Sequence, residues 1–174
     1  MVYTHYWAYQ PDSPSFAAVF PQLASDSRLI LSHLSARGIA LGGPTGIGEP
    51  LVNDSTITFN GVRPDSGENF VLAPGVGSGL TERTRTGEPF RLDYCQTRHL
   101  PYDLAVTAVL LRAQQLAPSD LVLASDGSWR DDWYPAQTLL IDLLSALPQI
   151  DALMPLSYLL GGPHALQAAA LAHA

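Results

Sequence analysis

Three side chains of this 174-residue sequence are predicted to act as a general base or a nucleophile, namely His5, Glu68 and Cys95. His5 lies in VYTHYWAY, residues 2–9, whose alternation is typical of a strand and sets the imidazole on an aromatic face. An imidazole at the wall of an aromatic pocket suits a catalytic base. A hydrogen-bonded imidazole in the core is the alternative.

Glu68 shares one strand face with Phe70 and Leu72 in the segment ENFVLAPG. If this face is the core, the carboxylate is drawn inward, and burial disfavours its charged form unless Arg91 or Arg98 pairs with it. Such a perturbed carboxylate is a candidate catalytic group. The alternative is a carboxylate in solvent beyond the end of the strand.

Cys95 belongs to FRLDYCQTRHLPYD, which predicts a strand running into a helix that begins at Pro101. The helix start and Arg98 would lower the pKa of the thiol and favour the nucleophilic thiolate. A small buried hydrophobic side chain is the alternative for a single cysteine.

The same strand-to-helix junction could hold a small anionic molecule. The free N–H groups of the helix start, the Thr97 hydroxyl and Arg98 would bind its charge, with Tyr102 beside them. Asp103, in the first turn, stabilises the helix through its dipole and would compete with a bound anion. An ordinary helix start is therefore the alternative.

Asn60 and Asp126 complete the predicted ligand-binding set. Asn60 stands in FNG before a turn, where a turn residue is the alternative to a ligand contact. Asp126 lies in LVLASDGSWRDDW, which resembles the metal-dependent Ser/Thr phosphatases around their LASDG-W-D segment. That resemblance implies a metal ligand at Asp126, and a polar Asp-Gly turn is the other interpretation. The five histidines show no zinc-site spacing, and we predict neither a metal nor a cofactor.

Several short segments taken together resemble a family of short bacterial and phage proteins without an established activity. They are HYW (5–7), FNG (59–61), ENF (68–70), C-x-T-x-R with PYD (95–103) and SDG (125–127). Gln96 and His99 stand where the family pattern has basic residues, which weakens any positive pocket. The resemblance implies that these polar clusters belong to one type of domain, and it implies no reaction.

Composition excludes several classes of function. The sequence has nine arginines and no lysine, which rules out a lysine Schiff base, a Walker A lysine and a kinase-type lysine. The formal charge of −7 repels phosphate backbones, so we expect no nucleic-acid partner.

The cellular setting is predicted from the cysteine count and from the hydrophobic segments. One cysteine cannot form an internal disulfide, and the N-terminal residues lack the pattern of a signal peptide, so we expect a cytoplasmic protein. Acidic residues and prolines interrupt the apolar segment 138–162, so we expect no membrane span.

The pattern of elements predicts an α+β fold, as one domain over residues 1–174 with a largely antiparallel sheet and helices mainly on one face. Strands are expected at 2–9, 39–41, 55–61, 68–75, 89–97 and 120–125, with a hairpin joining 55–61 to 68–75. Helices are expected at 14–37, with a break near Pro21 and a new start capped by Ser25 or Asp26, and at 101–117, 131–147 and 164–174. Residues 73–88 lack an apolar period and are predicted to be a loop, with the role of a lid.

Two functions from different classes fit these observations. The first is a small-molecule-binding enzyme of the hydrolase or transferase type, in which the residues above converge in one cleft around an anionic ligand. The second is a non-catalytic homo-oligomer or phage-associated interaction protein that uses the apolar C-terminal segment 152–174.

Overall fold

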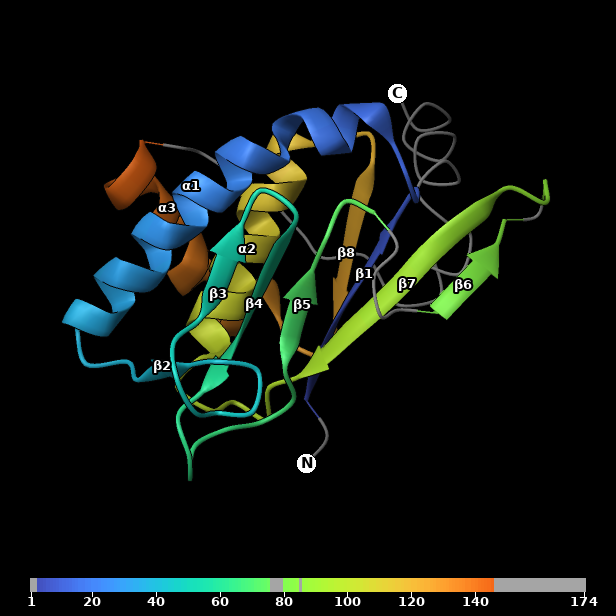
Figure 1. The fold of residues 1–174 in the computed structure, drawn as a ribbon. Coiled ribbons are helices and arrows are strands. Elements are labelled where there is room, and N and C mark those ends of the chain that lie inside the picture. The colour runs from blue at the N-terminus through green and yellow to red at the C-terminus, as the bar shows by residue number, and fades with distance from the viewer. Residues whose placement is uncertain (1–2, 76–79, 85, 146–174) are drawn as a thin grey trace.

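The computed structural model describes residues 3–75, 80–84 and 86–145. In these ranges helices and antiparallel sheets form an α+β fold, which confirms the predicted fold class (Figure 1). No helix in the described ranges is long and apolar enough to cross a membrane. The predicted helix at 164–174 and the segment 152–174 lie outside the described residues.

The first sheet has four strands in the order β6 (Leu80–Arg83), β7 (Pro89–Gln96), β1 (Thr4–Tyr9) and β8 (Leu121–Ser125). Both neighbours of β1 pair with it antiparallel. The N-terminal strand is therefore central, although its two neighbours come from much later in the chain.

One face of β1 builds the main core. Successive side chains of a strand point to opposite faces, so Tyr3, His5, Trp7 and Tyr9 share a side, and all four are buried, as the aromatic alternation predicts. The opposite face carries a smaller apolar cluster that includes Ala8, Phe90 and Ala124. Cys95 and Asp93 of β7 lie on the side of the main core, and the apolar residues of β7 lie on the other side.

The second sheet is arranged around β4 (Thr56–Gly61). Its partners are β2 (Leu41–Gly42), β3 (Leu51–Asn53) and β5 (Phe70–Leu72), all antiparallel to it. The predicted hairpin of β4 and β5 is confirmed, with Ile57 opposite Leu72 and Phe59 opposite Phe70. β3 was not expected from the sequence.

Three α-helices cover the core, α1 (Pro14–Ala36), α2 (Asp103–Leu116) and α3 (Tyr134–Leu144). α2 contacts both of the other helices, and Figure 1 shows the three grouped together. A π-helical turn, η1 (Trp129–Trp133), leads into α3. α2 begins at Asp103, two residues later than predicted. Tyr102 is the residue that flanks the helix start.

Two predictions about local structure are wrong. Helix α1 runs without a break past Pro21, because Phe20 and Leu23 on either side are fully buried and packing holds both turns in place. Asp26 is not a cap, and it binds Arg112 of α2 at 2.7 Å. The predicted loop 73–88 contains β6, an exposed edge strand whose pairing with β7 requires no apolar period.

Candidate functional site

Strand pairing brings three side chains with reactive atoms into one row on the core face of the first sheet. His5 of β1 lies opposite Cys95 of β7 on one side and opposite Ser125 of β8 on the other. Directly opposed residues have Cβ atoms about 4.5–5.5 Å apart, which is within reach of side-chain contact. The row exists only because two strands from the second half of the chain, β7 and β8, both pair with the N-terminal strand β1.

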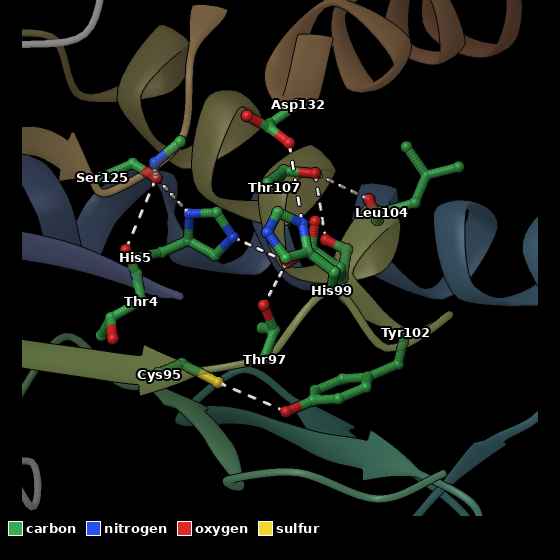
Figure 2. Close-up of polar contacts among 12 residues, drawn as sticks. Thr4, His5, Cys95, Thr97, His99, Tyr102, Leu104, Thr107, Ser125 and Asp132 are labelled. Carbon is green, nitrogen blue, oxygen red and sulfur yellow. Dashed lines mark hydrogen bonds and ion pairs between the residues drawn. The ribbon is translucent and has the colours of Figure 1, made fainter. Parts of the chain in front are cut away.

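His5 makes hydrogen bonds with both of its ring nitrogens. Nδ1 lies 2.9 Å from the Ser125 Oγ (Figure 2), and Nε2 lies 2.7 Å from Oδ1 of Asp103. The imidazole is completely buried, so these two groups determine its tautomer and its orientation. An aspartate, a histidine and a serine thus form one continuous polar array, which we call the His5 array.

Asp103 belongs to the first turn of α2, and its carboxylate points back to the sheet. Its Oδ1 accepts a hydrogen bond from the Thr97 hydroxyl as well as the contact from His5. Thr97 is fully buried, and the Asp103 side chain is 16% exposed. The Thr97 hydroxyl holds this carboxylate oxygen in place next to Nε2. Because a carboxylate accepts hydrogen bonds, the contact favours the tautomer of His5 with its proton on Nε2.

Ser125 ends β8 and is half-buried. Its Oγ accepts a hydrogen bond from the Gly127 N–H at 2.9 Å. The hydroxyl proton then has two acceptors, His5 Nδ1 at 2.9 Å and the Thr4 carbonyl at 3.5 Å. Because the shorter contact is the stronger one, the hydroxyl donates to Nδ1, which matches the Nε2–H tautomer.

Aromatic rings enclose the imidazole. Tyr3 and Trp133 both meet His5 edge to face, with ring centroids 5.0 Å apart in each case. His99, a half-exposed ring, stacks on Tyr3 at 3.5 Å and lies 3.7 Å from Asp132. His99 and its neighbour Arg98 both have left-handed backbone conformations, with φ of 57° and 58°. These dihedrals turn the chain sharply between β7 and α2.

Cys95 has the opposite character from the predicted nucleophile. The thiol is fully buried and donates to the Glu68 carbonyl, with the Tyr102 hydroxyl 3.9 Å away. Burial raises the pKa of the Cys95 thiol, where the sequence-based expectation was that a helix start and Arg98 would lower it. The side chain packs as a small apolar group with a weak donor.

Glu68 and Tyr102 tie segments of backbone together beside Cys95. The Glu68 carboxylate accepts the Gln96 N–H at 2.8 Å, and the Tyr102 hydroxyl donates to the Glu68 carbonyl at 2.8 Å. No arginine among the described residues is paired with Glu68. Glu68 precedes β5 and is half-buried. Figure 2 shows the Cys95–Tyr102 contact apart from the contact of His5 with Ser125.

Asn60 makes four hydrogen bonds with the protein itself. Its amide donates to the carbonyls of Pro44 and Gly67 and accepts from the N–H groups of Gly61 and Gly67. These bonds join two loops next to β4, so the side chain has no capacity left for a ligand. The turn interpretation accounts for it.

The predicted anion site is not assembled as expected. Thr97 directs its hydroxyl to Asp103, while Arg98 is exposed and donates from Nε to the Gln96 side chain at 3.2 Å. The carboxylate of Asp103 stands between the helix start and the sheet, where it would repel an anion.

Asp126 lies beside the array without belonging to it. Its carboxylate accepts the Thr4 N–H at 3.1 Å and so ties the exposed turn after β8 to β1. Among the described residues no group of three His, Cys, Asp or Glu side chains could hold a metal ion. The Asp-Gly turn interpretation fits this geometry.

Comparison with protein-family models, with curated proteins and with solved structures finds no match to this chain. The resemblance to short bacterial and phage proteins stays a prediction. The candidate site therefore depends on geometry alone.

Sequence reasoning found His5 and missed both of its partners. Ser125 was only part of an SDG turn, and Asp103 was considered for its effect on the helix dipole. A signal for Ser125 was present, because an apolar strand that ends in serine sets that hydroxyl at a strand end. No sequence signal shows that β1 and β8 are neighbours.

Proposed function

We propose that this protein is an enzyme of the hydrolase or transferase type that moves acyl groups through Ser125. The observation that supports the proposal is the completely buried His5, held between the Asp103 carboxylate at 2.7 Å and the Ser125 hydroxyl at 2.9 Å. A nucleophile next to a base that is oriented by a third group is the arrangement expected for covalent catalysis.

The reaction begins with attack by Ser125 Oγ on the carbonyl carbon of an ester or a similar acyl compound. As the O–C bond forms, the carbonyl π electrons move to the oxygen, and the hydroxyl proton moves to His5 Nδ1. Asp103 stabilises the resulting imidazolium through Nε2–H. Collapse of the tetrahedral adduct breaks the bond to the leaving group, which takes the proton from Nδ1.

The second half of the reaction uses water or another acceptor alcohol. His5 Nδ1 removes a proton from the acceptor as its oxygen attacks the acyl carbon, and Ser125 Oγ leaves with the proton. Water yields a carboxylic acid, and an alcohol yields a new ester. The same array therefore supports hydrolysis and acyl transfer.

The other parts of the functional hypothesis depend on composition. A single cysteine supports a cytoplasmic protein, and a charge of −7 argues against a nucleic-acid partner. The acyl compound that Ser125 attacks need not be anionic, because the geometry around Thr97 and Arg98 does not favour binding of an anion. An uncharged or weakly polar acyl compound is the better substrate class for a first screen.

A fluorophosphonate probe, which reacts with activated serine hydroxyls, tests this proposal directly. We expect one covalent adduct per chain, located by peptide mass spectrometry at Ser125. The Ser125→Ala variant should lose it, and Ser128→Ala should keep it, because Ser128 is an exposed serine in the same turn. Asp103→Asn should label at least tenfold more slowly, since a positioned general base contributes about 10²–10⁴-fold.

Labelling of many serines, or labelling that Ser125→Ala leaves unchanged, would contradict the proposal. A complete absence of labelling, together with no hydrolysis of p-nitrophenyl esters of short and medium chain length, would also contradict it. In that case the His5 array holds β1, β8 and α2 together and does not catalyse acyl transfer.

A further inference from the structure

The Tyr3 hydroxyl is a buried donor without a partner, next to the proposed nucleophile. Tyr3 is 3% exposed, and its hydroxyl oxygen makes no hydrogen bond within the described part of the chain. An unpaired buried hydroxyl is unfavourable, and most buried polar groups in proteins are paired. Its position therefore needs an explanation.

Gly127 shows where the Tyr3 hydroxyl points. A Cβ atom placed on Gly127 would lie 2.6 Å from the hydroxyl oxygen, so the phenol lies directly against this glycine. The N–H of the same glycine donates to the Ser125 Oγ at 2.9 Å. The phenol hydroxyl and the serine hydroxyl therefore adjoin one residue, and only the lack of a side chain at Gly127 allows this approach.

The nearest carboxylate already has other partners. Asp132 accepts the Ser128 N–H on Oδ2 at 2.7 Å, and its Oδ1 lies 3.7 Å from His99. Oδ2 also lies close to Gly127, 2.9 Å from the position of a Cβ placed there, so the Asp132 carboxylate adds to the negative field at the Tyr3 phenol. The Tyr3 donor is left beside Ser125, where the proposed reaction develops negative charge.

We propose that the Tyr3 hydroxyl donates the hydrogen bond that stabilises the oxyanion formed when Ser125 attacks an acyl group. This role depends on the proposed function. The phenol donates a hydrogen bond and keeps its proton, so the proton balance of the two half-reactions is unchanged. A fixed donor aimed at the developing charge is the usual source of such stabilisation.

The surroundings of Tyr3 keep the donor protonated. Burial raises the pKa of the Tyr3 phenol, and the carboxylates of Asp103 and Asp132 raise it further. His99, stacked on the ring at 3.5 Å, fixes the ring plane. The donor is thus positioned before a substrate binds.

The experiment compares Tyr3→Phe with Tyr6→Phe in fluorophosphonate labelling and in hydrolysis of a p-nitrophenyl ester. Tyr6 is the next residue after His5 in β1, and its side chain points to the opposite face of the strand, so it is a matched control for a tyrosine hydroxyl away from the array. We expect Tyr3→Phe to lower kcat by about 10²–10³-fold with KM unchanged, since that is the typical loss for one oxyanion donor. Tyr6→Phe should retain the wild-type rate.

A boronic acid that forms a tetrahedral adduct with serine gives a second readout. Its inhibition constant should rise in Tyr3→Phe, because the adduct resembles the tetrahedral intermediate. The melting temperature of Tyr3→Phe should equal or exceed that of the wild type, since the removed hydroxyl has no partner. A fall of several degrees would instead show a structural hydrogen bond and overturn the inference.

The outcomes separate the two proposals. If the wild type is labelled at Ser125 and Tyr3→Phe reacts at the same rate, the role of Tyr3 fails and the proposed function stands. If the wild type is neither labelled nor active on esters, both fail. A loss of rate in Tyr3→Phe with an unchanged melting temperature supports both.

Discussion

Removal of the Asp103 charge and removal of its whole carboxylate should have different effects on stability. Oδ1 alone receives the contacts from His5 and Thr97. In Asp103→Asn, an amide oxygen in that place can accept both hydrogen bonds, and only the charge is lost. In Asp103→Ala, two fully buried donors lose their acceptor.

The magnitudes follow from these contacts. A hydrogen bond to a charged group contributes about 1.5–3 kcal/mol and a neutral one about 0.5–1.5 kcal/mol, so Asp103→Asn should lose about 2 kcal/mol over two bonds. The lost charge in the first turn of α2 adds about 0.5 kcal/mol. For Asp103→Ala each of the two unpaired buried donors costs about 1–3 kcal/mol, and with the lost charge the total loss should be about 2.5–6.5 kcal/mol.

Urea denaturation of the purified variants measures both values. Asp142→Asn and Asp142→Ala are matched controls, because Asp142 is an exposed carboxylate on α3, and each should change stability by less than about 0.5 kcal/mol. In a double-mutant cycle with Thr97→Val, the losses should be non-additive by about 0.5–3 kcal/mol.

Equal losses for Asp103→Asn and Asp103→Ala would refute this reasoning, since the difference between them reports the two buried donors. Additive effects of Thr97→Val and Asp103→Ala would refute the contact between those residues. Equal losses would also remove the support for the Asp103 contact in the His5 array.

Three further predictions concern groups outside the His5 array. Because Cys95 is fully buried and burial raises its pKa, iodoacetamide at pH 8 should leave the thiol unmodified in the native protein and alkylate it once urea unfolds the chain. Burial also raises the pKa of Asp93 above its ordinary value of 3.8, so the native state favours the protonated form, and stability relative to Asp93→Asn should fall as pH rises from about 4 towards 7. A stability difference that stays constant over this range in denaturation curves would contradict that sign. Gly127→Ala should lose about 1–3 kcal/mol in the same assay, because its Cβ would lie 2.6 Å from the Tyr3 hydroxyl, whereas Gly75→Ala, whose nearest neighbour is at 4.0 Å, should change little.

The sequence by itself determined the elements whose pattern is local. The alternation of residues 2–9 predicted an aromatic strand face, and the apolar periods predicted α2 and α3 within a few residues of their observed bounds. The turn between β4 and β5 was short enough for the hairpin to be predicted from the two strands that flank it. Each of these features depends on neighbours along the chain.

Other elements were decided by tertiary contacts. Pro21 would end an isolated helix, and burial of the turns on both sides keeps α1 continuous. β6 has no apolar period, and its backbone bonds to β7 define it. β7 presents Cys95 and Asp93 to the main core, while Phe90 faces the smaller cluster, so hydrophobicity alone would have given the wrong inner face.

The candidate site shows the same division. His5 was recognised because one strand determines which way its side chain points. Ser125 and Asp103 are 120 and 98 residues away from it in the sequence, and only the pairing of β1 with β8 and the packing of α2 bring them within hydrogen-bonding distance. Residue types can be read one at a time, but an array of three groups depends on non-local pairing, which no local pattern of residues records.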